Sequence, residues 1–274
     1  MTINCKGSLI DISTPKVMGI LNLTPDSFYD GGKYKDEKGV LVQVEKMLTE
    51  GATFIDIGAY SSRPGADHIS EEEEKKRLLP IIKLLCSEFP EILISIDTFR
   101  STIAKEGITC GAAMINDISA GMLDDEMIAT IGKLQVPYVM MHMKGTPQTM
   151  KDLNQYEDMV REIQFYFSER IAVARHYGIN DVIIDPGFGF AKSIKQNFEL
   201  LQKLELFKFQ NVPILAGVSR KSMIYKTLGT TAKEALNGTT VLNTVALQNG
   251  VSILRVHDVK EAVECIKLVE ELGL

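Results

Sequence analysis

The chain has 274 residues, of which 45% are hydrophobic and 24% are charged, and its formal net charge is −6. These proportions are typical of a globular protein and exclude a chain that is disordered throughout. The acidic balance argues against a nucleic-acid partner, because nucleic-acid-binding domains usually carry a basic surplus.

No apolar stretch approaches the roughly 18 residues that span a bilayer, so we expect no membrane partner. The first residues, MTINCKGSLIDIS, lack the charged and apolar segments of a secretory signal. The four cysteines are scattered and form no CxxC pair, a pattern typical of reduced cytosolic thiols that does not indicate zinc. We therefore expect a cytoplasmic protein.

Short apolar runs alternate along the chain with longer amphipathic stretches. Eight such runs are candidate strands, at residues 17–21, 54–57, 92–96, 113–115, 138–141, 182–184, 213–218 and 253–256. Most show no polar alternation, as expected for strands buried on both faces of a parallel sheet. Alternating strands and helices fit a doubly wound sheet or a closed barrel, and eight strands favour an α/β fold of the (β/α)8 TIM-barrel type. We predict one domain over residues 1–274.

Three of the longer stretches open with a residue that can cap a helix, followed three positions later by Glu. These pairs are Ser70 and Glu73, Asn154 and Glu157, and Asp258 and Glu261. The second helix is predicted over residues 154–177 with Gly178 as its stop, and the third ends near Gly273. Pro80 lies inside the first helix and is predicted to kink it or to restart it.

Polar groups suited to chemistry follow every apolar run. They are Asn22, Ser61 to Arg63, Asp97, Asn116 with Asp117, His142, Asp185, Ser219 to Lys221, and Arg255 with His257. In a barrel the carboxyl ends of the strands converge on one rim, where barrel enzymes place their active sites. Loops that face water are usually polar, and this alone would explain one such residue. It explains less well why a polar group follows all eight runs.

Eight local motifs occupy these positions in order. They read MGILNLTPDSFYDGG (18–32), DIGAYSSRPGA (56–66), SIDTFR (95–100), INDIS (115–119), MMHMKGTPQTM (140–150), IDPGFGFAK (184–192), GVSRKSMI (217–224) and RVHDV (255–259). Together they closely resemble the dihydropteroate synthases, pterin-binding TIM-barrel enzymes of the folate pathway, and the resemblance runs almost from end to end.

The resemblance implies a homodimer that condenses 6-hydroxymethyl-7,8-dihydropterin pyrophosphate with p-aminobenzoate and releases pyrophosphate with the help of Mg²⁺. It also implies that sulfonamides compete with p-aminobenzoate. One departure stands out. The family often has Gly-Glu-Ser-Thr before Arg-Pro-Gly, whereas this chain has Ala59-Tyr60-Ser61-Ser62. We expect this change to tune affinity and to leave the reaction unchanged.

A pterin ring presents an edge of N–H groups, a carbonyl and ring nitrogens, which carboxylates, amides and cations can read. Charge-assisted hydrogen bonds of this kind contribute about 1.5–3 kcal/mol each. The resemblance assigns pterin binding to Asp97, Asn116, Asp185, Lys221 and Arg255 and catalysis to Asp97, Lys221 and Arg255. Asp97, Asn116 and Asp185 are also open to a structural interpretation, as helix caps or turn residues.

The departing pyrophosphate needs an anion site. The resemblance assigns this site to Asn22, Ser61, Ser62, Arg63, Arg255 and His257. Arg255 and His257 are two positions apart, so they point the same way along the last strand. The amide oxygen of Asn22 is a hard ligand suited to Mg²⁺, with water and phosphate oxygens completing the shell. Surface solvation of Arg63 and a local loop bond of Asn22 remain alternatives.

For p-aminobenzoate, the resemblance assigns an apolar slot with a polar end. The residues are Phe28, Ser62, Pro64, Phe190, Ser219 and Lys221. Ordinary core packing is the alternative for the two aromatic rings.

We further hypothesise a dissociative path in which Asp97 stabilises cationic charge on the pterin. Three rival functions remain open: a Schiff base on Lys221, a methyltetrahydrofolate–corrinoid methyltransferase, and a non-catalytic pterin-binding homologue. The Ser-Arg-Pro-Gly loop and the RVHDV strand argue against the methyltransferase, which needs no pyrophosphate site.

Overall fold

The computed structural model describes residues 1–23, 33–60, 68–150 and 153–273. Its centre is a sheet of eight parallel strands in the order β8-β7-β6-β5-β4-β3-β10-β9. The strands are β3 (Lys16–Asn22), β4 (Phe54–Gly58), β5 (Ile94–Asp97), β6 (Met114–Asp117), β7 (Tyr138–Met141), β8 (Val182–Asp185), β9 (Leu215–Ala216) and β10 (Ile253–Val256). A parallel bridge between Ile184 and Ile214 joins the two outer strands. The sheet therefore closes into a barrel.

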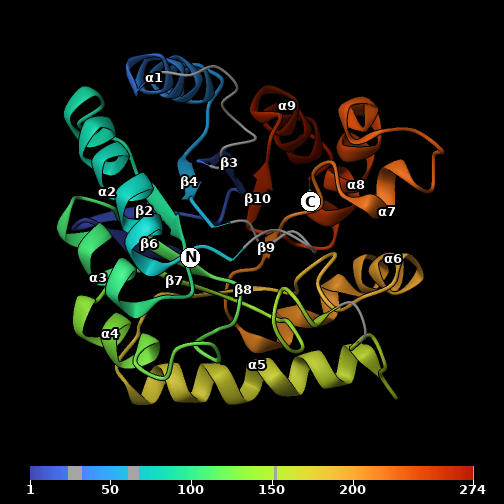
Figure 1. Ribbon diagram of the computed structural model, residues 1–274. Coiled ribbons are helices and arrows are strands. Elements are labelled where there is room, and N and C mark those ends of the chain that lie inside the picture. The colour runs from blue at the N-terminus through green and yellow to red at the C-terminus, as the bar shows by residue number, and fades with distance from the viewer. Residues whose placement is uncertain (24–32, 61–67, 151–152, 274) are drawn as a thin grey trace.

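Helices surround the strands as an outer ring (Figure 1). They are α1 (Lys33–Thr49), α2 (Glu71–Glu88), α3 (Ser101–Thr109), α4 (Met127–Leu134), α5 (Met159–His176), α6 (Ile194–Gln202), α7 (Ser222–Tyr225), α8 (Leu236–Gln248) and α9 (Val259–Glu270), with 3-10 helices η3 (Leu204–Gln210) and η4 (Ala232–Glu234). The predicted single-domain (β/α)8 barrel is confirmed, and every predicted strand is present within a few residues of its expected position.

A hairpin that the apolar pattern did not predict precedes the barrel. It consists of β1 (Thr2–Cys5) and β2 (Ser8–Asp11), paired antiparallel. Its turn places Lys6 at φ 54° and Gly7 at φ 84°, the left-handed pair that a tight hairpin requires. Ile3 and Cys5 are buried in this hairpin while their neighbours are exposed. Only alternate residues of β1 are apolar and buried, so the hairpin lacks the continuous apolar run that marked the barrel strands.

The hairpin covers the amino-terminal end of the barrel. Buried side chains from the hairpin and from the starts of the barrel strands form one apolar cluster. The first group is Ile3, Cys5 and Ile12, and the second is Met18, Phe54, Ala113, Met114, Val139, Ile183, Leu215 and Ile253. The amide of Asn4 also donates to Asp181 Oδ2 at 2.9 Å, just before β8. This end of the barrel, which we call the floor, is therefore a packed apolar core.

The predicted helix starts are partly correct. Ser70 caps α2, accepting from the amide of Glu73, as expected. The helix predicted from Asn154 instead begins at Met159, with Asp158 as the cap that accepts from Arg161 N. Asp158 satisfies a free amide of the first turn, and Asn154 lies too far upstream to do so. The stop at Gly178 is correct, since α5 ends at His176 and Gly178 has φ 76°.

Two further helix predictions are only partly correct. Asp258 precedes α9 but makes no side-chain cap, because both of its carboxylate oxygens accept from Arg220. Pro80 does not restart α2, which continues through it as one helix. Proline removes one backbone donor at that turn, and packing of buried Leu78 and Ile82 on either side maintains the helix.

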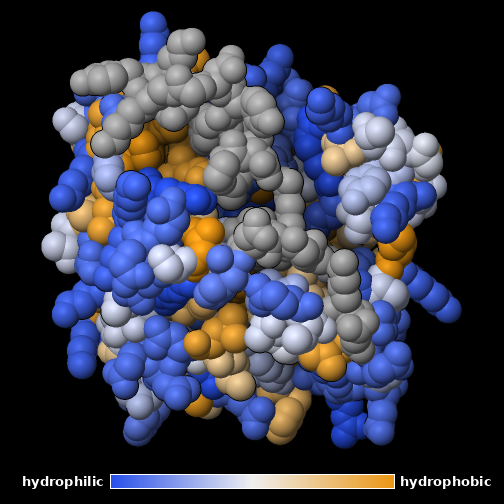
Figure 2. Space-filling view, viewed as in Figure 1, coloured by the Kyte–Doolittle hydropathy of each residue, from blue (hydrophilic) through white to orange (hydrophobic). Residues whose placement is uncertain are grey.

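A second apolar layer lies between the barrel and the helices, with Phe167 of α5 edge-on to Phe207 of η3. On the face drawn in Figure 2, apolar side chains form small separate patches on a largely hydrophilic surface. Across the described residues, none of the helices has the length and apolar character that crossing a membrane requires.

Candidate active site

The carboxyl ends of the strands form a charged mouth at the end of the barrel opposite the floor. The structure places there six polar side chains from five strands and one loop: Asp56, Asp97, Asn116, Asp185, Arg255 and, after β9, Lys221. Five of these six were predicted for the pterin site. They meet because parallel strands of a barrel all point their carboxyl ends to one rim.

Arg255 lies between two carboxylates at this mouth. Its Nε lies 2.6 Å from Asp56 Oδ2, and its Nη2 lies 2.8 Å from Asp97 Oδ2. Asn116 Nδ2 donates to the same Asp56 oxygen at 3.1 Å. Burial tends to lower the pKa of Arg255, but the charges of Asp56 and Asp97 outweigh it and raise the pKa, so the guanidinium stays charged.

Asp56 was missing from the predicted site. It is fully buried, and its other oxygen, Oδ1, has no hydrogen-bond partner among the described residues. A buried acceptor without a partner is rare in proteins and suits a donor on a bound ligand. The signal was present in the sequence, because Asp56 is a charged residue inside the otherwise apolar run 54–57.

Asp97 is the carboxylate of this cluster whose proton affinity is shifted most clearly. Burial raises the pKa of Asp97 to about 7, against the opposing charge of Arg255 and with a contribution from neighbouring Asp56. A carboxyl group with a pKa near neutrality titrates in the working range of an enzyme, which is typical of functional sites.

Lys221 and Asp185 form the other side of the mouth. Lys221 Nζ donates to the backbone oxygen of Phe188 and lies 5.1 Å from the centre of the Phe190 ring. Its withdrawal from water lowers the pKa of Lys221 to about 8, although the charge of Asp185 opposes this. The pKa of Asp185 is raised, because the effect of burial outweighs the opposing effects of the Lys221 charge and a 2.8 Å hydrogen bond from Gly187 N.

Ser219 and His257 lie together at the mouth. The Ser219 hydroxyl is 3.0 Å from His257 Nδ1 and accepts from the His257 amide at 3.2 Å. Between Ser219 and Lys221, Arg220 adopts φ 53° and turns away to pair with Asp258 at 2.7 Å. Arg220 thus anchors the loop and leaves its two neighbours at the mouth.

The remaining predicted residues are placed as follows. Asn22 is the last residue of β3, beside Gly58 at the end of β4. Phe190 is half-buried in the loop after β8. Phe28, Ser61, Ser62, Arg63 and Pro64 lie outside the described residues.

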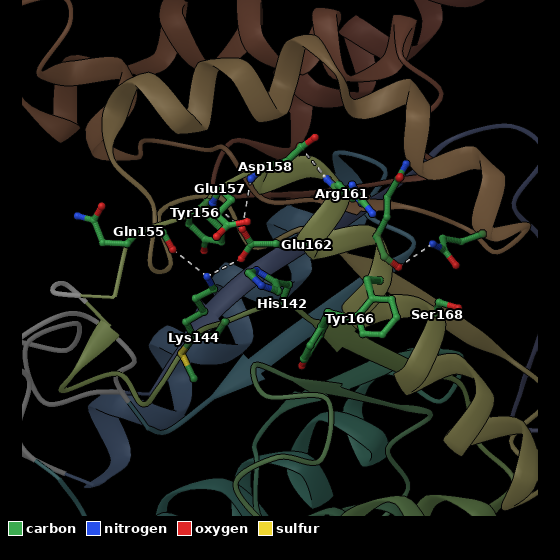
Figure 3. A pocket seen from close by; sticks show the side chains of 14 residues that line it. His142, Lys144, Gln155, Tyr156, Glu157, Asp158, Arg161, Glu162, Tyr166 and Ser168 are labelled. Carbon is green, nitrogen blue, oxygen red and sulfur yellow. Dashed lines mark hydrogen bonds and ion pairs between the residues drawn. The ribbon is translucent and has the colours of Figure 1, made fainter.

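A separate cavity of about 1210 Å³ lies outside the mouth, between the loop after β7 and helix α5 (Figure 3). Lys144 spans it, donating to Gln155 O at 2.9 Å and pairing with Glu162 at 2.8 Å. None of the mouth carboxylates lines this cavity, so its chemistry is not that of the cluster around Arg255.

The closed barrel and its charged mouth define the class of protein. The sequence model described as "Pterin binding enzyme" matches residues 18–257, and the chain belongs to that family. Among curated relatives, the dihydropteroate synthase of Escherichia coli K12 is 40% identical over 272 residues, covering 98% of this chain and 96% of the relative. That of Synechocystis is 42% identical over 259 residues, covering 93% and 89%.

Solved structures agree with these relatives. The Yersinia pestis dihydropteroate synthase, solved with a sulfonamide drug complex, superposes with a TM-score of 0.93 at 37% identity, covering 100% of this chain and 99% of that one. The Xanthomonas albilineans enzyme, solved with 4-aminobenzoic acid, gives a TM-score of 0.92 at 36% identity and covers 99% and 98%. Within the pterin-binding enzymes, the chain is thus grouped with the dihydropteroate synthases, transferases of folate synthesis.

Proposed function

We propose that this chain condenses 6-hydroxymethyl-7,8-dihydropterin pyrophosphate with p-aminobenzoate to give 7,8-dihydropteroate and pyrophosphate. The observation that supports this most directly is the mouth of the barrel. Two carboxylates share one arginine, and the deeper carboxylate, Asp56, has an acceptor oxygen that no other described residue pairs with.

A bicyclic pterin suits this arrangement. Its N–H edge would donate to Asp185 and to the free oxygen of Asp56, and Asn116 and Lys221 would donate to its acceptors. Arg255, held flat by Asp56 and Asp97, is placed to stack on the ring, since guanidinium is planar and weakly hydrated. The pterin therefore replaces water at groups that the fold has already ordered.

The second substrate would bind beside Lys221. The ring of Phe190 offers an apolar surface close to the Lys221 ammonium, and the Ser219 hydroxyl is within reach of His257. An aromatic ring with a carboxylate at one end fits a surface of this kind. Phe28, Ser62 and Pro64 complete this proposed subsite.

The proposed pyrophosphate subsite comprises Asn22, Ser61, Ser62, Arg63, Arg255 and His257, with Mg²⁺ as the cofactor. The donor set fits the ion, because an amide oxygen such as that of Asn22 is a hard ligand and Mg²⁺ retains water and phosphate oxygens around it. When bound, the ion would neutralise charge on the departing diphosphate. Chelation of Mg²⁺ is expected to abolish turnover and to weaken binding of pyrophosphate itself, measured by calorimetry.

For the chemical step we propose a dissociative path. The C–O bond at the pterin methylene breaks, and its electron pair leaves with the pyrophosphate oxygen. The aniline nitrogen of p-aminobenzoate then forms the C–N bond and releases a proton to water. Ionised Asp97 would stabilise the cationic pterin between these events, while Lys221 and Arg255 would hold the ring. A kinetic isotope study that reports fully concerted displacement would contradict this path.

We further propose that the protein works as a cytoplasmic homodimer. Exposed Val241 and Leu268 lie on the adjacent helices α8 and α9 and offer apolar surface for a second copy. The four unpaired thiols are consistent with a reducing compartment. Light scattering on the purified protein tests the dimer, and a monomer at micromolar concentration would refute it.

One incubation separates the proposed function from its rivals. The protein is mixed with pterin pyrophosphate, labelled p-aminobenzoate and Mg²⁺, and labelled dihydropteroate is the expected product. Pterin that binds without turnover would instead indicate a non-catalytic homologue. Methyl transfer from methyltetrahydrofolate to a corrinoid would indicate the methyltransferase. Borohydride trapping of a substrate on Lys221 would indicate a Schiff base. Sulfonamides are expected to compete with p-aminobenzoate.

A further inference from the structure

The loop after β8, residues 186–192, is folded unusually tightly. Gly187, Gly189 and Ala191 adopt φ of 74°, 84° and 48° in turn. A side chain at Gly187 would meet the backbone oxygen of His142 at 2.1 Å, so the loop is pressed against the end of β7. Within this loop Phe190 N donates to Gly187 O at 3.2 Å, and the backbone oxygens of Phe188 and Phe190 accept from side chains.

Two lysines satisfy three of these oxygens. Lys221 donates to the oxygen of Phe188 from the mouth side. Lys192 donates to the oxygens of Gly187 and Phe190, both at 3.0 Å, from the opposite side. The function proposed above uses Lys221 and leaves Lys192 without a role.

Lys192 is buried, with 9% of its surface exposed, and its third contact is His142 Nδ1 at 3.1 Å. None of these three contacts is a carboxylate, which is uncommon for a buried lysine. Burial lowers the pKa of Lys192 to about 7, with Asp185 opposing the shift and Lys221 and Lys144 adding to it. Burial likewise holds the pKa of His142 well below its usual range.

The contacts of Lys192 can be made in either protonation state. An ammonium donates three bonds, to the two carbonyls and to unprotonated His142 Nδ1. A neutral amine still donates to both carbonyls and accepts from His142 when the imidazole proton is on Nδ1. The hydrogen bonds between Lys192 and the loop therefore depend on the position of its nitrogen and not on its charge.

We propose that Lys192 is a positioning residue for p-aminobenzoate, acting through the loop to hold the Phe190 ring and the Lys221 ammonium in their relative places. This inference rests on the function proposed above. The Phe190 ring and the Phe188 oxygen, both on this loop, are neighbours of Lys221 Nζ. Movement of the loop therefore shifts both walls of the subsite together.

The pterin side depends on Lys192 much less. The backbone oxygen of Asp185 accepts from His142 N at 2.9 Å as part of the pairing between β7 and β8. Asp56, Asp97 and Asn116 come from β4, β5 and β6, which pair with neither β8 nor β9. Removal of Lys192 should thus affect the two substrates unequally.

The test compares Lys192→Met with Lys192→Gln, using Lys195→Met on the exposed face of α6 as the matched control. Met has a similar length and no donor, so it removes the Lys192 bonds to the Phe190 and Gly187 oxygens, and Gly187 O keeps only its 3.2 Å bond from Phe190 N. We expect Lys192→Met to raise KM for p-aminobenzoate at least about tenfold, since small displacements of a substrate-holding group cost up to about 100-fold. The Kd for the pterin substrate, measured by calorimetry, should rise by a clearly smaller factor, because only Lys221 and Asp185 of the proposed pterin groups contact this loop. Lys195→Met should match the unaltered protein.

Gln keeps N–H donors but is shorter and uncharged, so an increase in KM of about threefold is expected, smaller than that of Met. A purely structural role for Lys192 would lower kcat with the folded fraction and leave KM unchanged. An unchanged KM in folded Lys192→Met overturns the inference, as does an equal loss of affinity for both substrates. If the Met variant is not recovered folded, the Gln variant decides, and an unchanged KM then overturns the inference.

The failure of this inference is distinguishable from that of the proposed function. If the unaltered protein makes no dihydropteroate, the proposed function fails. If it makes dihydropteroate and the Lys192 variants keep their KM for p-aminobenzoate, only the role of Lys192 fails.

Discussion

At the floor of the barrel, Met18 and Phe54 point inward and pack with Ile3 of the amino-terminal hairpin. Two residues beyond Phe54 on β4, at the mouth, Asp56 forms an ion pair at 2.6 Å with Arg255 of β10, a strand whose first residue, Ile253, also packs in the floor. The floor excludes water and contributes stability. The mouth gathers charges whose partners are only partly supplied by the protein. Because the two ends share strands, the packed floor gives the mouth a rigid base, and substitutions at each end should affect different properties.

The largest effect on folding is expected at the floor. Phe54 is fully buried, so Phe54→Ala removes its packing and leaves a cavity. We expect a loss of about 3–5 kcal/mol in the free energy of unfolding, measured by urea denaturation, with unchanged KM values in the protein that remains folded. Phe209→Ala is the control, because Phe209 is 85% exposed and its loss should cost less than about 0.5 kcal/mol. Equal effects of both substitutions would contradict the packed floor.

The opposite result is expected at the mouth. Lys221→Ala should lower kcat/KM by roughly 10²–10³-fold, as does removal of a preorganised charged donor in other enzymes, and should weaken pterin binding. Thermal stability should be affected less, because the hydrogen bond of Lys221 goes to a loop backbone oxygen, that of Phe188, and not to a core side chain. Lys226→Ala, at the exposed end of α7, serves as the control. Near-normal turnover by Lys221→Ala would remove this lysine from the site.

The pH dependence sharpens the contrast further. Burial raises the pKa of Asp97 to about 7, so its carboxylate is ionised only above that pH. Lys221, whose pKa burial lowers to about 8, is charged only below that value. If both charged forms are needed, kcat/KM should rise through pH 7 and fall above pH 8. Asp97→Asn should remove the rise on the acid side at a lower overall rate, whereas exposed Asp125→Asn should keep the full profile. A rise that persists in Asp97→Asn would assign it to another group.

The smallest effect is expected on the outer ring of helices. Ser70 caps α2 through a bond from Glu73 N at 3.2 Å. Ser70→Ala should cost about 1 kcal/mol of stability and leave kcat/KM unchanged. Ser168→Ala, on the exposed face of α5, should cost less, and chemical denaturation compares the two. A cost equal to that of Ser168→Ala would show that the cap contributes nothing.

Much of this architecture could be predicted from local patterns. The apolar runs located all eight barrel strands, and the polar residues that follow them located the rim, because burial on both faces of a parallel sheet leaves a clear trace in sequence. The hairpin β1–β2 escaped because only alternate residues of β1 are buried. Asp158 was missed as the cap of α5 because Asn154, a few residues earlier, offered the same local signal.

The amino-acid sequence by itself determined the family, the order of the strands and five of the six polar groups at the mouth, since these follow from local periodicity and short motifs. Only the tertiary structure revealed which of those groups are partners. Asp56 became part of the site through its contact with Arg255, 199 residues away, and Lys192 through His142, 50 residues away. Such pairs exist only once the barrel has closed, because side chains on different strands acquire their distances, their burial and hence their charges from the complete fold.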